Sequence, residues 1–492
     1  DDSTNDLTEE FPVVDPPAGE MEVALDVSDV QELKEGNKQR GWLYSSILSG
    51  LMATTRKIAG SDTEEALAQV LELLEKFFAG HNERYSVDAF LSLFLLAIYY
   101  KTPRLRTNLV EDNETTIRES YHYFKFSAVA YGWKLMNGLM FDNKEHMIMR
   151  GFLTGDQQNN FCICEHTGIS LDDIIATKWT SSDFHPAHFV AVDHRTESVV
   201  LAIRGTFHIK DALTDLIAHS VPFMDGKVHN GMLKCATKKL ETVKQTILDS
   251  LEKYEGYRLV VVGHSLGAGT AALVSLLLKK EYPTMDIQCF AYAPPCVFDI
   301  SLANLCRTFI KSFALENDVV PRLSYGSMEA LKDSTIRLMG QSTSNFHRLV
   351  QAFAAGGPQT EAMSKRVAGV LSYDSHIVDT KVLEDVRGPY LEDKLFPPGY
   401  VYHILRDEHP KYKNPPLYHM EFSDGSGFAE IIVASDMFSD HMPNAYNKAF
   451  EGIIRHQSLV RHGLLACEHQ QFDMYPCKEK EILCSNSVEK CI

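Results

Sequence analysis

The sequence predicts an α/β fold built on a mostly parallel central sheet. From about residue 185, short runs rich in β-branched residues alternate with helical segments. The strand-like runs are apolar on both faces, as expected for strands that helices cover on either side. The pentapeptide GHSLG at 263–267 lies between such a run and a helical segment. This is the strand-turn-helix setting in which G-x-S-x-G forms a sharp turn, the nucleophile elbow.

Composition divides the 492-residue chain into four parts. Residues 1–38 are acidic and rich in proline, which predicts a flexible leader. Residues 39–115 place apolar side chains at helical spacing, so we expect a helical N-terminal region that packs on the main domain. The apolar stretch 90–100 within it is too short to cross a bilayer. Residues 116–460 carry the α/β pattern, and 461–492 form a tail that contains cysteines.

The α/β part has a regular order of elements and one long break. Residues 325–394 contain helix-like pieces but no strand pattern, and connections of this length are typically functional or disordered. We interpret this segment as an insertion. The pattern predicts helices at 232–253 and 266–281, and strands at 188–194, 198–205, 258–263, 285–293, 308–315, 399–405 and 417–423.

Charge excludes one class of partner. The chain has 48 Lys and Arg against 66 Asp and Glu, a formal charge of −18. Nucleic-acid binding needs a basic surface, so we expect no nucleic-acid partner. The same charge argues against electrostatic adhesion to anionic membranes, and membrane contact would have to be hydrophobic.

Most of the ten cysteines lie in apolar stretches, which favours a reducing, intracellular compartment. Cys162, Cys164 and His166 could suggest a metal site, but no second cysteine pair follows at zinc spacing. We therefore expect neither a metal nor a cofactor. Free thiols, disulfides or palmitoylation would all fit the tail cysteines, which are Cys467, Cys477, Cys484 and Cys491.

Ser265 is the candidate nucleophile, because the elbow would project it above the sheet while the flanking glycines relieve crowding. The helix that begins at Leu266 directs its N-terminal N–H groups to the place where negative charge develops. His264 is expected to be structural, since the residue before the nucleophile points away from it. The oxyanion hole would use the N–H groups of Leu266 and of Thr206, which follows the strand 198–205.

A serine nucleophile needs a base that a carboxylate orients, in the chain order serine, acid, histidine. Asp318 follows the strand 308–315 at its carboxyl end, and Glu316 is a rival. His441 lies in a loop before a helix, which suits a base that reaches across a cleft. Spacing alone leaves open seven other histidines, which are His347, His376, His403, His409, His419, His456 and His462.

Several longer stretches resemble a known family. GHSLGAG, IRGT followed by KDALTDL, and ENDVVPRLS resemble the class 3 (fungal-lipase-like) serine lipases. FSAVAYGW, HNGMLKCA, LFPPGYVYHI and DHMP are similar to the sn-1-specific diacylglycerol lipases among them. The similarity covers residues 117–324 and 395–450. It implies the α/β-hydrolase fold, with Ser265 as nucleophile, Asp318 as acid, His441 as base and Thr206 and Leu266 at the oxyanion positions.

The resemblance also implies a reaction and a setting. We expect a serine lipase that releases a fatty acid from diacylglycerol and works without a cofactor. It would be intracellular, either cytoplasmic or peripheral on the cytoplasmic side of a membrane, and would meet its substrate at a membrane or lipid-droplet surface. Residues 207–228 would cover the cleft. Residues 325–394 lie at the position along the chain where the family has a long regulatory insertion. The four transmembrane helices of animal diacylglycerol lipases have no counterpart in the sequence. A phospholipase A1, a general carboxylesterase and a non-catalytic lipase-fold interaction protein remain as alternatives.

Overall fold

The structure is a computed structural model, and it describes the chain in several stretches. The predicted leader, most of the 325–394 insertion and the tail after residue 465, with its four cysteines, lie outside the described residues. The described residues are 48–77 and 89–97 with short gaps, 109–136, 154–206, 217, 219–338, and 394–465 without 408–410, 413 and 424.

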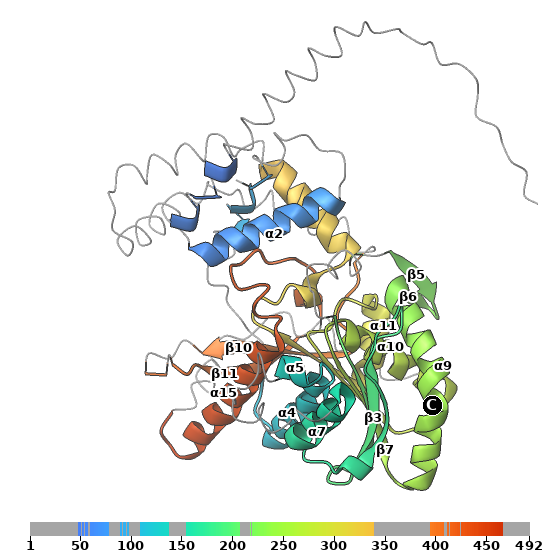
Figure 1. Cartoon of the computed structure of the whole chain (residues 1–492). Coiled ribbons are helices and arrows are strands. Elements are labelled where there is room, and N and C mark those ends of the chain that lie inside the picture. The colour runs from blue at the N-terminus through green and yellow to red at the C-terminus, as the bar shows by residue number, and fades with distance from the viewer. Residues whose placement is uncertain are drawn as a thin grey trace, which may run out of the picture.

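A nine-stranded sheet forms the centre of the molecule, and its middle is parallel (Figure 1). Five neighbouring strands run in one direction and pair in register with one another. In spatial order they are β4 (Ser198–Ile203), β7 (Arg258–His264), β8 (Ile287–Tyr292), β9 (Ile310–Leu315) and β10 (Tyr400–Asp407).

Both edges of the sheet are antiparallel, so the sheet is mixed and only its centre has the parallel pairing that the sequence predicts. β3 (His188–Asp193) and β2 (Ile174–Lys178) extend the sheet beyond β4. β11 (Leu417–Ser423) and β1 (Val110–Glu111) extend it beyond β10. Neither β1 nor β2 was expected, and β1 lies in the region predicted to be helical, because two to five residues of mixed polarity carry little periodic signal.

Helices cover both faces of the sheet (Figure 1). One face carries α9 (Asn230–Lys253) and α10 (Leu266–Glu281), which pack on each other. The other carries α4 (Glu114–Val129), α7 (Gly155–Thr167) and α15 (Pro443–Arg461). The crossover helices between parallel strands therefore lie where a parallel sheet requires them.

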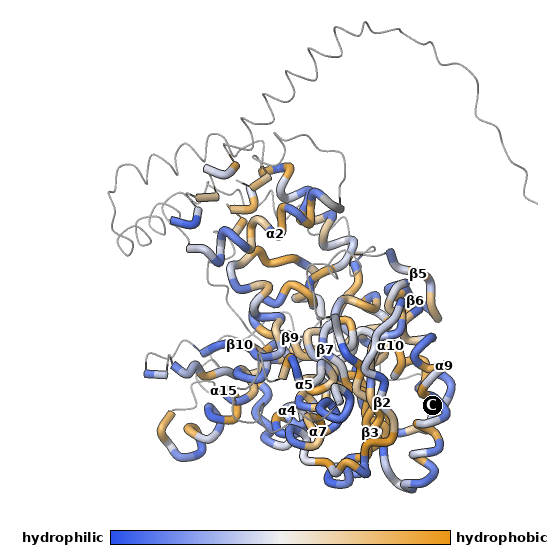
Figure 2. Tube along the Cα trace, in the orientation of Figure 1, coloured by the Kyte–Doolittle hydropathy of each residue, from blue (hydrophilic) through white to orange (hydrophobic). Residues whose placement is uncertain are grey.

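The side chains of β7 show how the sheet serves two cores. Leu259 and Val261 belong to the core under α9 and α10, whereas Val260 and Val262 belong to the core under α4. This alternation follows the two-residue period of a strand. Because both faces are covered, the central strands are apolar along their whole length, as the hydrophobic colour of the strand region in Figure 2 shows.

The N-terminal helices belong to the same body as the sheet. Within α2 (Ser61–Phe77), buried side chains such as Leu67 and Leu71 join the core cluster that contains the β7 residues. Figure 1 shows α2 lying across the helical residues 325–338, whose Met328 is in the same cluster. Among the described residues, no helix combines the length and apolar character that crossing a membrane requires.

Apart from His441, which lies in the loop before α15, the predicted site residues follow the carboxyl ends of parallel strands. Residues 204–206 follow β4, Ser265 follows β7, and 316–318 follow β9. Because the carboxyl ends of parallel strands meet at one edge of the sheet, these loops converge there. We call this edge the catalytic edge.

Phe313 on β9 tests the importance of the aromatic core. Its fully buried ring stacks on Tyr292 at 4.9 Å and on Tyr402 at 5.2 Å between ring centroids. We expect Phe313→Ala to lower the free energy of unfolding by about 3–5 kcal/mol, measured by urea denaturation, because it leaves a cavity. The control Leu305→Ala, at a side chain that is 56% exposed, should change it by less than about 0.5 kcal/mol. Equal effects of the two changes would contradict this account of the core.

Candidate functional site

Ser265 lies at a sharp turn between β7 and α10. Its backbone has φ 59° and ψ −131°, a region that side-chain-bearing residues rarely adopt. The turn is held in place because the Ser265 N–H donates to the Tyr292 carbonyl on β8 at 2.9 Å. A strained backbone of this kind persists only where surrounding contacts hold it in place. Such strain is concentrated at functional sites.

The glycines around Ser265 are required by close approach of the backbone. A Cβ at Gly263 would lie 2.3 Å from the Gly267 carbonyl carbon and oxygen, and one at Gly267 would lie 2.2 Å from the Ile203 carbonyl oxygen. Real Cβ atoms do not come so close to backbone. The turn therefore packs directly against the end of β4, which no alanine in these positions would allow.

Asp318 and His441 are in direct contact. His441 Nδ1 donates to the Asp318 carboxylate, at 2.9 Å from Oδ1 and 3.1 Å from Oδ2. The Val320 N–H donates to Asp318 Oδ1 at 3.0 Å, and both side chains of the pair are buried. A hydrogen bond at Nδ1 leaves Nε2 as the nitrogen that can accept a proton.

Tyr446 is a site residue that the sequence analysis missed. Its hydroxyl donates to Asp318 Oδ2 at 2.8 Å and accepts from the Leu315 N–H at 3.0 Å. Burial raises the pKa of Tyr446 well above its usual value, and the Asp318 charge is the next cause, so the phenol stays protonated and can donate. In the sequence, the only sign of this role was that Tyr446 is an aromatic residue in the first turn of the helix that follows His441. Nothing in the sequence identified Asp318 as its partner.

The rivals for acid and base have other partners. Glu316 Oε1 accepts from the Arg406 N–H, so its carboxylate is turned toward β10. His403 Nε2 donates to the Glu316 carbonyl, and His419 lies between the carboxylates of Asp407 and Glu421. His456 contacts the Tyr418 carbonyl and His462 the Ser458 carbonyl. His347, His376 and His409 lie outside the described residues.

The sequence analysis expected the His264 side chain to point away from the nucleophile. In the structure its ring lies against the ring of His441. The two ring centroids are 4.9 Å apart, and the ring is also 5.6 Å from that of Tyr446. His264 Nδ1 and the Tyr131 hydroxyl are hydrogen-bonded at 2.9 Å. Burial, followed by the neighbouring His441, lowers the pKa of His264 well below 6.5. The ring is therefore a neutral packing partner of the base, consistent with a structural role.

The predicted oxyanion residues lie on two adjoining segments. A Cβ at Gly205 would lie 2.4 Å from the His264 carbonyl oxygen and 3.1 Å from Ser265 Cβ, so the end of β4 runs beside the turn. Thr206 is the next residue along this segment. Leu266 is the first residue of α10, where the N–H groups of a helix have no partner within the helix.

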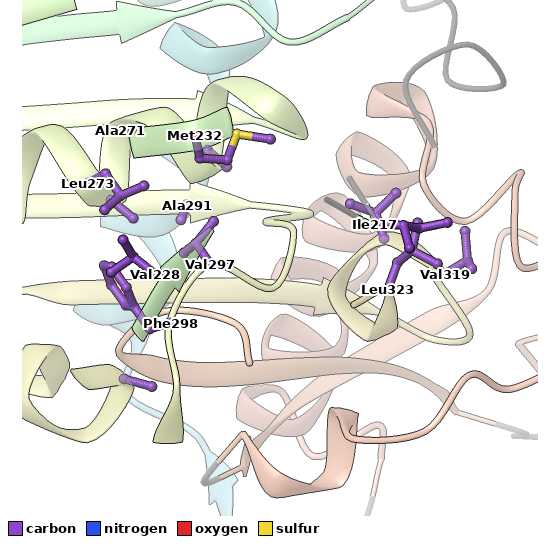
Figure 3. Packing of buried hydrophobic residues seen from close by; sticks show 14 of the residues in the cluster. Ile217, Val228, Met232, Ala271, Leu273, Ala291, Val297, Phe298, Val319 and Leu323 are labelled. Atoms are coloured by element: carbon purple, nitrogen blue, oxygen red, sulfur yellow. The ribbon is translucent and has the colours of Figure 1, made fainter. Parts of the chain in front are cut away.

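The segment expected to cover the cleft is described only in part. Residues 207–216 and 218 lie outside the described residues. Ile217 is buried beside Val319 and Leu323, next to the acid loop, as Figure 3 shows. Within residues 220–229, β5 (Ser220–Phe223) and β6 (Gly226–His229) form a hairpin.

A second acidic group supports the loop that carries the base. Asp440 Oδ2 accepts from the Asn317 N–H at 3.1 Å, and the Asn317 side-chain amide donates to Asp436 Oδ1 at 3.0 Å. Burial, followed by the Asp436 charge, raises the pKa of Asp440 to about 9. Asp440 is therefore neutral at pH 7 and stands directly before His441.

The possible metal ligands of the FCICEH stretch lie on α7. Cys162 is buried in the core between this helix and the sheet. Across the described part of the chain, no three or more His, Cys, Asp and Glu side chains are arranged to hold a metal ion.

Comparison with known proteins matches the centre of the chain to one family. The model of the family described as Lipase (class 3) matches residues 200–328. Human diacylglycerol lipase-alpha is 29% identical over 343 residues, which are 63% of this chain and 32% of that protein. Mouse diacylglycerol lipase-beta is 29% identical over 383 residues, 69% of this chain and 57% of that protein.

A fungal relative is shorter. The secreted mono- and diacylglycerol lipase A of Penicillium cyclopium is 33% identical over 148 residues, 29% of this chain and 48% of that protein. The chain thus spans about a third to somewhat more than half of the length of these relatives.

The raised pKa of Asp440 predicts a pH-dependent stability. Between about pH 4 and pH 9 the folded protein retains a proton on Asp440 that the unfolded chain releases. Asp440 therefore lowers the free energy of unfolding progressively as pH rises through this range. We expect Asp440→Asn to raise the melting temperature by a few degrees at pH 8. The gain should disappear near pH 4, where the unfolded chain also carries the proton. An equal gain at both pH values, or a loss at pH 8, would contradict the buried neutral Asp440.

Proposed function

Because the chain contains a class 3 lipase domain, we propose that it is a serine lipase that hydrolyses an acyl ester of diacylglycerol and releases a fatty acid and a monoacylglycerol. The observation that carries this proposal is the buried contact between Asp318 and His441 beside the strained turn at Ser265. Its similarity to diacylglycerol lipases supports the choice of substrate class. We infer that the mixed sheet and the elbow belong to an α/β-hydrolase fold.

The proposed reaction begins with proton transfer from Ser265 Oγ to His441 Nε2 as the oxygen attacks the ester carbonyl. His441 then gives this proton to the leaving glyceride oxygen, and the acyl group stays on Ser265. Water releases the fatty acid by the same sequence in reverse. Asp318 remains ionised throughout, holds the tautomer of His441 and stabilises the imidazolium that forms.

The tetrahedral intermediate carries a negative charge, which the N–H groups of Thr206 and Leu266 would stabilise. Thr206 follows the end of β4, and Leu266 is the first residue of α10. Donors that are already in place cost no reorganisation at the moment of reaction, and each is typically worth about 10²- to 10³-fold in rate.

The substrate position and the setting are also proposals. From the resemblance to sn-1-specific enzymes, we propose cleavage at sn-1. We propose an intracellular protein, peripheral on the cytoplasmic side of a membrane, because most of the ten cysteines lie in apolar stretches, as is usual in a reducing compartment. In the proposed domain division, the helices before residue 116 and the segment 325–394 are additions to the lipase domain.

The decisive measurement is fatty-acid release from diacylglycerol in mixed micelles, with different acyl chains at sn-1 and sn-2. We expect release of the sn-1 chain by the wild type and a loss of at least about 10³-fold in Ser265→Ala. The control Ser275→Ala changes a buried serine of the same helix and should leave the rate unchanged.

Two other substrates, assayed in parallel, define the alternatives. Faster turnover of phosphatidylcholine than of diacylglycerol would indicate a phospholipase A1, and turnover of a short soluble ester alone would indicate a carboxylesterase. A wild type that cleaves none of the three would contradict the proposal of a lipase.

Tyr446→Phe tests whether the hydroxyl positions the acid. The change removes a hydrogen bond to a charged group, and we expect kcat for a soluble ester to fall about tenfold with little change in KM. Tyr254→Phe, far from the site, is the control. An unchanged kcat would show that the hydroxyl contributes packing alone.

A further inference from the structure

Four lysines gather around one loop at the catalytic edge, in a chain whose net charge is −18. The loop is 181–186, between β2 and β3. We call Lys178, Lys234, Lys238 and Lys239 the lysine cluster. Lys178 ends β2, and the other three lie in the first half of α9.

The loop lies at the end of the sheet where the candidate nucleophile is. Lys178 pairs with His188, and His188 pairs with Ile203, the last residue of β4. The Arg204 guanidinium donates to Ser181 Oγ at 2.8 Å and to the Trp179 carbonyl at 3.2 Å. The loop is thus attached to the strand that leads into the oxyanion segment.

Each lysine of the cluster contacts this loop or its flanks. Lys238 Nζ donates to the Asp183 carbonyl at 2.9 Å, and Lys178 Nζ donates to His185 Nδ1 at 2.7 Å. Lys239 Nζ donates to the Pro186 carbonyl and, at 2.8 Å, to His188 Nδ1. Lys234 Nζ lies over the Phe184 ring, 5.6 Å from its centroid.

The charges of the cluster are not neutralised within the described chain. Among the described residues, none of the four lysines forms an ion pair with a carboxylate. Burial, followed by the charge of Lys178, lowers the pKa of Lys239 to about 7. Burial and the same lysines lower the pKa of His185 to about 4, so this histidine accepts from lysine as a neutral ring. The loop carries one carboxylate of its own, that of Asp183, and the exposed ammonium groups of Lys234 and Lys238 remain available to an external anion.

Phe184 stands at the tip of the loop and faces solvent. Ser182 and His185 exchange backbone hydrogen bonds of 3.1 and 2.9 Å, which closes a tight turn. Phe184 has φ 54° in this turn, where glycine or asparagine would be less strained, and its side chain is 49% exposed. The chain therefore maintains a strained backbone that presents an aromatic ring between lysines.

We propose that this loop docks on a membrane that contains anionic phospholipids, with Phe184 entering the interface and Lys234 and Lys238 contacting headgroup phosphates. An exposed aromatic ring flanked by lysines is typical of elements that bind at the lipid–water interface. The net negative charge of the chain does not oppose this contact, because charges separated by more than about 8–10 Å are screened at physiological salt. The docked loop would bring the catalytic edge to the lipid surface.

The test is co-sedimentation of the full chain with phosphatidylcholine vesicles, with and without phosphatidylserine. The Ser265→Ala background excludes turnover, so a failure of docking is distinguishable from a failure of catalysis. We expect phosphatidylserine to strengthen binding and the double variant Lys234→Gln/Lys238→Gln to weaken it about 25-fold, since each lysine near an anionic surface contributes roughly fivefold. Phe184→Gly should also weaken binding, while glycine relieves the strain at φ 54° and preserves the fold.

The matched control is Lys253→Gln/Lys448→Gln, which removes two exposed lysines outside the cluster and should bind like the parent. Equal binding by the cluster variant and this control would overturn the proposal. So would protection of the protein against thermal unfolding by inorganic phosphate without any binding to vesicles, because the cluster would then be a site for a small soluble anion.

Discussion

The close approach between the end of β4 and the turn at Ser265 is the constraint on which the rest of the site depends. Gly267 comes so near the Ile203 carbonyl that no side chain would fit between them, and Gly205 lies equally close to the His264 carbonyl. This contact joins two neighbouring parallel strands at their carboxyl ends. It places the proposed oxyanion donors on both sides of the nucleophile, before any substrate is present.

The acid is stabilised by a second layer of contacts. A buried carboxylate without partners would cost several kcal/mol, but Asp318 accepts hydrogen bonds from His441, Tyr446 and the Val320 N–H. The Asp440 carboxyl, nearby, accepts from the Asn317 N–H, and burial raises its pKa to about 9.

The parts of the fold with strong local patterns could be predicted from the sequence. The strand before GHSLG, the long helices α9 and α10 and the loop position of Asp318 all follow from periodicity and motif. The contacts that could not be predicted join distant segments. Tyr446 reaches Asp318 across 128 positions, and Lys239 on α9 reaches His188 on β3 across 51 positions. Net charge likewise contains no information on where charges gather along the surface.

The strands β9 and β10 are adjacent and parallel, although about 85 residues separate the end of one from the start of the other. The entropy lost on closing such a loop grows only with the logarithm of its length, and doubling it costs about 0.6 kcal/mol. The register of β9 and β10, and with it the meeting of Asp318 and His441, is therefore almost independent of how much chain lies between them. Evolution could lengthen, shorten or replace that connection at little energetic cost to the fold.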